Sequence, residues 1–154
     1  MYNYAQLQKL SKAELITLVV KESSKGIITG PDKVNSFFTD FSGLVKDWNK
    51  EHFIVLAVNT KNIIVHSELV SMGHLTSSLV HPREVFKNII QVPGIAGFII
   101  GHNHPSGDPQ PSCADADITN MLSDGGKLLG LPLLDHVIFT KSGRYYSFQD
   151  KGRL

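Results

Sequence analysis

The stretch that decides the architecture is Ala96-Gly97-Phe98-Ile99-Ile100-Gly101-His102-Asn103-His104-Pro105. Its first five residues are small or apolar and predict a buried strand. In extended backbone, side chains two residues apart point to the same side, so His102 and His104 can converge on one point while Asn103 faces away. Pro105 has no backbone N–H and prevents the strand from simply continuing. The strand therefore ends by presenting two imidazoles on one side.

The segment that follows returns the chain to these two histidines. Gly107, Pro109 and Pro111 predict an irregular turn. A helix is predicted next, over Asp115–Leu129, and Ser112 suits the capping position before it. The buried face of this helix is expected to carry Ile118, Met121, Leu122 and Leu128. The turn lets Asp115 bring an oxygen ligand to the point where the imidazoles converge.

The rest of the chain alternates between helical and strand patterns. A helix is predicted over Lys12–Glu22, and another from Pro31, with apolar residues at helical spacing as far as Trp48. A third helix is predicted from Pro82 to about Pro93. Two hairpins are predicted, formed by Phe53–Val58 with Ile63–Val70 and by Leu133–Thr140 with Arg144–Phe148, and a further short strand is expected within Ser71–His81. Helices flanking a partly antiparallel sheet indicate an α+β (mixed α/β) fold. We divide the chain into an N-terminal helical appendage, residues 1–30, and one main domain, residues 31–154.

Composition limits the class of protein. The chain has 154 residues, is 42% hydrophobic, and carries 15 Lys and Arg against 14 Asp and Glu. This near-balance argues against tight phosphate-backbone binding as the main activity. No apolar run is long enough to cross a bilayer and no signal peptide is visible, so we expect a cytoplasmic protein without membrane contact. Cys113 is the single cysteine, which excludes an intrachain disulfide and a Cys-based zinc site.

The convergent side chains predict a metal site. Two imidazoles and one carboxylate suit Zn²⁺ and leave a fourth tetrahedral position for water, which is the ligand count of a catalytic site. The same nitrogen and oxygen donors also accept Fe²⁺, Mn²⁺ or Co²⁺. A histidine pair of this spacing is also compatible with a purely structural role, and the prolines with a simple surface loop. We interpret Asp108 as a turn former and expect structural or surface roles for His52, His66, His74 and His81.

The motif around the histidines resembles a known signature. His102-x-His104-Pro105 followed by Pro111-Ser112-x-x-Asp115 is similar to the JAMM motif of JAB/MPN-domain metallopeptidases. The longer strings His102–Gly107 and Leu128–His136 resemble the RadC-like branch of these proteins. The similarity runs from about Pro31 to Phe148. Larger RadC proteins also carry a helix-hairpin-helix module, for which too few residues precede Pro31.

The resemblance implies a fold and a set of site residues. The fold would be of the JAB1/MPN type, a curved mixed β-sheet flanked by helices with cytidine-deaminase-like architecture. One zinc per chain would be held by His102, His104 and Asp115. Glu51 matches the family's general base, although a solvated charge is the simpler interpretation from sequence alone, and Glu68 is the reserve candidate.

Two further matches leave alternatives open. Ser112 matches the serine that supports the developing oxyanion, and it is equally suited to be an N-cap. Asp135-His136 stands where the RadC-like pattern also has Asp-His. This pair either orients the metal ligands or pins its strand, and we leave it outside the predicted site.

The predicted function is hydrolysis of a peptide or isopeptide amide bond in a peptide or protein-conjugate substrate. Two alternatives come from other classes: a DNA-repair or DNA-metabolism accessory protein that binds partners or nucleic acid, and a non-catalytic MPN scaffold. The sequence predicts neither the identity of the substrate nor the oligomeric state.

Overall fold

The computed structural model of the chain describes residues 27–45, 47–73 and 80–154. The described elements, in chain order, are α3 (Pro31–Val45), β1 (Glu51–Val58), β2 (Ile64–Gly73), α4 (Pro82–Ile89), β3 (Gly97–Asn103), α5 (Cys113–Leu129), β4 (Leu133–Phe139) and β5 (Tyr145–Ser147). The predicted helix Lys12–Glu22, and the appendage apart from residues 27–30, lie outside these ranges. None of the described helices is long and apolar enough to span a membrane.

The five strands form one mixed sheet in the order β2-β1-β3-β4-β5. Three neighbouring pairs are antiparallel, while β3 and β4 run parallel and are connected through α5. Parallel neighbours need such a crossover because the chain has to return to the end of the sheet at which the first strand began. The crossover places the start of α5 beside the end of β3, where the two histidines lie.

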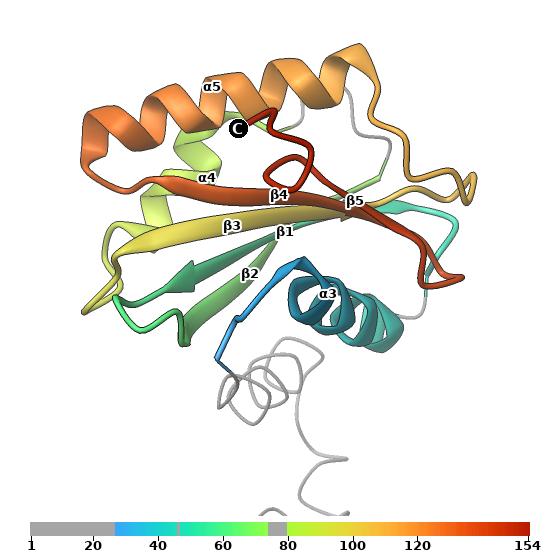
Figure 1. Ribbon diagram of the computed structural model, residues 1–154, viewed down its shortest axis with the longest axis horizontal. Helices are drawn as coiled ribbons and strands as arrows, with labels where there is room; N and C mark the ends of the chain where they lie inside the picture. The colour runs from blue at the N-terminus through green and yellow to red at the C-terminus, as the bar shows by residue number, and fades with distance from the viewer. Residues whose placement is uncertain (1–26, 46, 74–79) are drawn as a thin grey trace, which may run out of the picture.

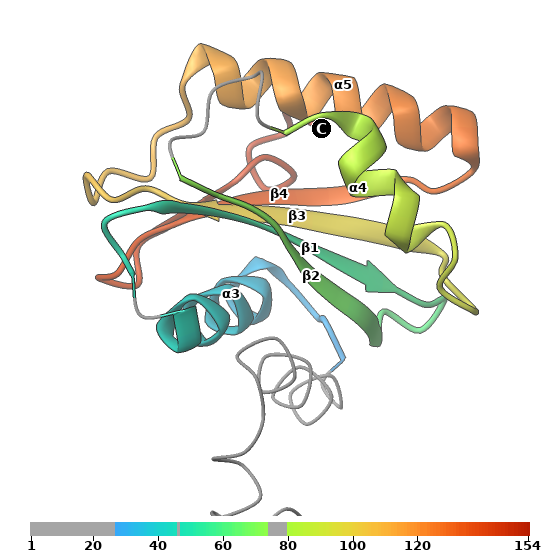
Figure 2. The ribbon, with the colours of Figure 1, turned by 180° about the vertical axis from the view of Figure 1, so that it is seen from behind.

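Helices cover both faces of the sheet, as Figures 1 and 2 show from opposite sides. The helix α3 packs on one face, and α4 and α5 pack on the other. Side chains alternate along β1, so Phe53, Val55 and Ala57 enter the core beneath α4 and α5. Ile54, Leu56 and Val58 enter the core beneath α3. The molecule is therefore the mixed α+β fold that the sequence predicts, with helices on either side of a mixed sheet.

Most predicted elements are confirmed. Both hairpins form, as β1 with β2 and as β4 with β5. The strand predicted at Ala96–Ile100 continues through His102 to Asn103 as β3. Of the further strand expected within Ser71–His81, residues 71–73 belong to β2, and residues 74–79 lie outside the described ranges.

Three predicted details are wrong. Met121 and Leu128 were expected in the core, but their exposed fractions are 39% and 89%. The buried stripe of α5 instead follows Ile118, Leu122 and Gly126, at intervals of four residues. Leu128 lies in the last turn of α5, where its side chain points away from the core. The helix α3 ends at Val45, short of Trp48, whose indole packs edge-on against Phe139 at 6.2 Å.

Gly101 allows α3 to approach the strand that carries the histidines. A Cβ at this position would lie 2.3 Å from Cε2 of Phe38, whose ring is fully buried and stacks on Phe139 at 5.5 Å. We expect Gly101→Ala to lower the free energy of unfolding by about 2 kcal/mol, because the packed ring has little room to move. Urea denaturation measures this loss. In a double-mutant cycle, Phe38→Leu should recover part of it, and a cycle without coupling would exclude this contact as the cause.

Candidate metal centre

Three side chains from two elements meet at the end of the sheet. His102 lies in β3, His104 follows that strand directly, and Asp115 lies in the first turn of α5. The two imidazole Nε2 atoms are 2.9 Å apart. Asp115 Oδ1 lies 3.1 Å from His102 Nε2, and Asp115 Oδ2 lies 3.5 Å from His104 Nε2. Each residue offers one donor atom within 4.8 Å of the other two, so the group can hold a metal ion.

A buried chain of hydrogen bonds fixes the tautomer of His102. The Thr119 hydroxyl donates to the backbone carbonyl of Asp115 at 2.5 Å, so its oxygen has to accept from His136 Nδ1 at 2.6 Å. Burial, followed by the charge of His102, holds the pKa of His136 well below its usual value, so its ring is neutral. His136 Nε2 therefore accepts from His102 Nδ1 at 2.9 Å. This assignment leaves the lone pair of His102 Nε2 facing the site.

His104 has a matching arrangement. Its Nδ1 lies 2.7 Å from the backbone carbonyl oxygen of Asp108, which can only accept a hydrogen bond. Nδ1 therefore carries the proton, and in the neutral ring the lone pair lies on Nε2. Two lone pairs that face each other at 2.9 Å repel unless a cation or a proton lies between them. This donor set, completed by the carboxylate of Asp115, fits a divalent metal ion.

The charges around Asp115 favour a cation as well. Burial alone raises the pKa of the Asp115 carboxyl, but the hydrogen bonds that it accepts from His102 and His104 whenever their Nε2 atoms are protonated outweigh burial and hold this pKa well below its usual value. Burial lowers the pKa of His104, yet the hydrogen bonds to Asp115 and to the Asp108 carbonyl raise it above its usual value overall. The carboxylate therefore stays ionised while positive charge is favoured beside it.

Ser112 caps α5 and holds the carboxylate of Asp115. Its backbone N–H and its hydroxyl both donate to Asp115 Oδ2 at 2.7 Å, and its oxygen accepts from the Asp115 N–H at 3.2 Å. These contacts form a capping box, which confirms the N-cap interpretation of Ser112. The box leaves Asp115 Oδ1 directed at His102 and fixes the rotamer of the ligand.

Glu51 lies at the open side of the centre. It lines a hollow of about 360 Å³ together with Asn49, His104, Pro105, Ser106, Ser112 and Asp115. The side chain of Asn103 positions this part of the chain, because it accepts from the His52 N–H at 2.7 Å and donates to the Lys50 carbonyl at 2.9 Å. These two hydrogen bonds fix the backbone on either side of Glu51. Glu68 lies elsewhere, bonded to Asn88 on α4 at 2.5 Å.

The sequence analysis left His136 outside the predicted site and did not single out Thr119. His136 and Ile100 are paired in the parallel register between β4 and β3, which brings His136 beside His102. Its neighbour Asp135 faces the opposite way and accepts from the Ser147 hydroxyl at 2.7 Å. Both interpretations left open for the Asp-His pair therefore apply. His136 hydrogen-bonds to the candidate ligand His102, and Asp135 hydrogen-bonds to Ser147 on the edge strand β5.

Loss of the buried hydrogen-bond chain is expected to weaken metal binding. Thr119→Val keeps the shape of the side chain but removes the hydroxyl that fixes the tautomer of His136. We expect this variant to lose about tenfold in zinc affinity, and His136→Leu to lose roughly tenfold to a hundredfold. Competition with a fluorescent chelator measures both affinities.

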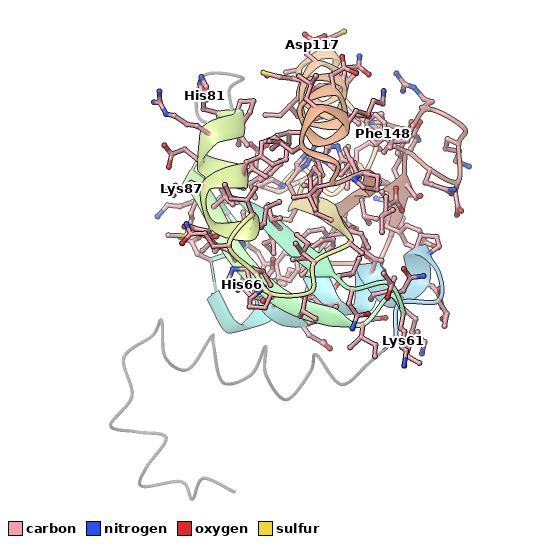
Figure 3. The ribbon with its side chains drawn as sticks, turned by 90° about the vertical axis from the view of Figure 1, so that its left-hand side faces the viewer. Lys61, His66, His81, Lys87, Asp117 and Phe148 are labelled. Carbon is pink, nitrogen blue, oxygen red and sulfur yellow. The ribbon has the colours of Figure 1, made fainter. Side chains whose placement is uncertain are left out.

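His66→Leu is the matched control for His136→Leu. His66 lies on the edge strand β2, and Figure 3 shows it on the opposite side of the molecule from Phe148, the ring that stacks on His136 at 4.9 Å. The control should bind zinc as the wild type does. An unchanged zinc affinity in Thr119→Val and His136→Leu would contradict the role assigned to the buried hydrogen-bond chain.

Metal affinity is also expected to depend on pH. Because the pKa of His104 is raised, the ring keeps its second proton to a higher pH than a free histidine, and this proton occupies the donor nitrogen Nε2. Apparent zinc affinity should therefore increase by about tenfold per pH unit below this pKa and level off above it. Chelator competition measures the slope of apparent zinc affinity against pH. A window from about pH 5.5 to 8.5 brackets the usual histidine pKa of about 6.5. An affinity that stays flat across this window would contradict it.

Comparisons with known proteins agree with this geometry. The family profile described as "RadC-like JAB domain" matches residues 28–153. A UPF0758 protein from Methanosarcina mazei is 46% identical over 85% of this chain and 55% of its own length. One from Chlorobium chlorochromatii is 45% identical over 76% of this chain and 52% of its own length. The chain spans about half the length of these two curated relatives.

Another relative is matched over a larger share of its length. The UPF0758 protein from Chlorobium phaeovibrioides is 41% identical over 99% of this chain and 72% of its own length. The family profile covers the five strands, the helices on both faces of the sheet and all three candidate ligand side chains. The chain therefore belongs to the RadC-like JAB domain family.

Proposed function

We propose that the chain is a zinc-dependent hydrolase that cleaves a peptide or isopeptide amide bond. One observation carries this proposal: the three donors converge beside a hollow that Glu51 also lines. Three protein ligands next to an accessible hollow are typical of a catalytic zinc site, whereas a structural site is closed by four. The donor set of two imidazoles and one carboxylate supports zinc among the divalent metals.

The polypeptide supplies the proton transfers. When bound, zinc acts as a Lewis acid and lowers the pKa of water to about 7. The Glu51 carboxylate takes the proton of the attacking water as general base and returns it to the leaving amine as general acid. Asn103 holds the Glu51 backbone from both sides, so the carboxylate enters the hollow from a fixed point of β1.

Ser112 has two roles in this proposal. Its hydroxyl donates to Asp115 Oδ2, and it lines the same hollow as Glu51. Rotation about one side-chain torsion redirects the hydroxyl toward an oxyanion in the hollow. The backbone N–H of Ser112 remains on the Asp115 carboxylate, so the ligand stays held during this change.

The decisive experiment separates the general base from the ligands. Glu51→Gln should bind one zinc per chain as the wild type does, yet hydrolyse at a rate lower by at least about a hundredfold. The His102→Ala/His104→Ala double variant should lose the metal and the activity together. Metal content is measured by elemental analysis, and activity by mass spectrometry on a proteome-derived peptide library and on lysine-linked conjugates.

Glu68→Gln is the matched control, since Glu68 is bonded to Asn88 on α4 and should leave hydrolysis unchanged. Zinc retained in full by the double histidine variant would overturn the metal assignment. Wild-type protein that holds zinc but cleaves neither the peptide library nor the lysine-linked conjugates would instead support a scaffold role.

A further inference from the structure

A second hollow adjoins the metal centre on its open side. Its volume is about 440 Å³, and its lining includes Trp48, Lys141 and Arg144. Asn49, His104 and Pro105 also line the hollow that contains Glu51. The two hollows therefore adjoin each other at His104, a candidate metal ligand.

Three segments far apart in the sequence build this second hollow. They are the connection from α3 to β1, the connection from β3 to α5, and the turn from β4 to β5, and all three lie at the same end of the sheet in both views (Figures 1 and 2). The Arg144 guanidinium donates to the Gly107 carbonyl and so links two of the segments. Asn35 on α3 donates to the Gly143 carbonyl at 3.3 Å, which anchors the turn. The walls are thus tied together by the chain itself.

The second hollow is positively charged. Lys141 and Arg144 are both exposed, and within the described ranges neither forms an ion pair. Other cations do have acidic neighbours, as in the pair of Lys50 with Asp47 at 3.0 Å. No aspartate or glutamate belongs to the lining itself, and the nearest ones along the chain are Asp47 beside Trp48 and Asp108 beside Gly107.

We propose that this hollow binds a carboxylate of the substrate polypeptide, either an acidic side chain or the free C-terminus, beside the bond to be cleaved. The inference rests on the proposed amide hydrolysis and adds a substrate preference to it. A guanidinium offers several N–H donors in a planar fork that matches a carboxylate, even with one donor engaged at Gly107. The indole of Trp48, held edge-on by Phe139, provides an apolar wall for the aliphatic part of an acidic side chain.

The charge pattern favours a carboxylate over a nucleic-acid backbone. Strong phosphate-backbone binding uses several cations arranged along a surface. The hollow holds two cations, and the whole chain has 15 Lys and Arg against 14 Asp and Glu. Two cations facing one confined space are suited to a single carboxylate.

Equilibrium binding tests the preference without relying on turnover. The full chain carrying Glu51→Gln, loaded with zinc, is titrated into fluorescent hexapeptides with two central glutamates or two central glutamines. Each peptide is made with a free and with an amidated C-terminus, which distinguishes the two sources of the carboxylate. Exposed ion pairs change affinity by up to about fivefold each, so we expect the carboxylate to improve binding by roughly tenfold.

Lys141→Gln/Arg144→Gln should abolish this preference and leave affinity for the neutral amidated peptide unchanged. Lys61→Gln/Lys127→Gln is the matched control, because it removes two exposed charges remote from the hollow. Lys61 follows β1 and Lys127 lies near the end of α5, both at the opposite end of the sheet; Figure 3 shows Lys61 from that end. The control should retain the full preference.

Three results would overturn the proposal. The first is an equal loss of the carboxylate preference in the control Lys61→Gln/Lys127→Gln, which would indicate a general charge effect. The second is a preference that survives in Lys141→Gln/Arg144→Gln, which would indicate a carboxylate bound elsewhere. The third is a single-stranded oligothymidylate that binds more tightly than the acidic peptides and loses affinity in that variant. Because no turnover is measured, an absence of hydrolysis would count against the proposed function alone.

Discussion

The candidate metal centre depends on two imidazole nitrogens that are made to face each other. His102 and His104 each have Nδ1 satisfied by an acceptor, so both Nε2 lone pairs point at the same place, 2.9 Å apart. Such an arrangement is unfavourable in a low-dielectric interior unless a cation or a proton lies between the nitrogens. The protein maintains it with contacts that are themselves buried, which extend from His136 to Thr119 and on to the backbone of α5. Stability and the proposed metal binding would therefore be coupled through the same hydrogen bonds.

Alternation along β3 allows one strand to organise both the ligands and the carboxylate opposite them. His102 faces α5, while Asn103 faces the other way and bonds to the backbone around Glu51. Gly101, between Ile100 and His102, leaves the space that the ring of Phe38 fills. A shift of this strand by one residue would exchange the two faces, and the ligand and the anchor of Glu51 would be lost together. The register of β3 against β1 is consequently part of the site.

The local sequence pattern was sufficient to predict part of this site. The spacing of His102 and His104, the forced turn and the Ser112–Asp115 capping box are short-range features that can be read along the sequence. The role of His136 was not accessible in this way, because it depends on the parallel register across a crossover of more than twenty residues. Leu128 illustrates the same limit for packing, since helical periodicity does not reveal where the supporting core ends. The roles of Glu51 and Ser112 in catalysis remain predictions.

In the proposed hydrolase, the unequal burial of the two histidines would set the direction from which a substrate approaches. His102 is 1% exposed, and its ring stacks on Phe53, while Phe148 closes the far side of His136. The side chain of His104 is 14% exposed and borders both hollows. Among the described residues, the His104 side of the centre is therefore the open one, where Glu51 lines one hollow and Lys141 and Arg144 line the next. Chemistry and substrate preference would then be divided between two neighbouring spaces that meet at one ligand, so loops that alter the second space need not disturb the metal.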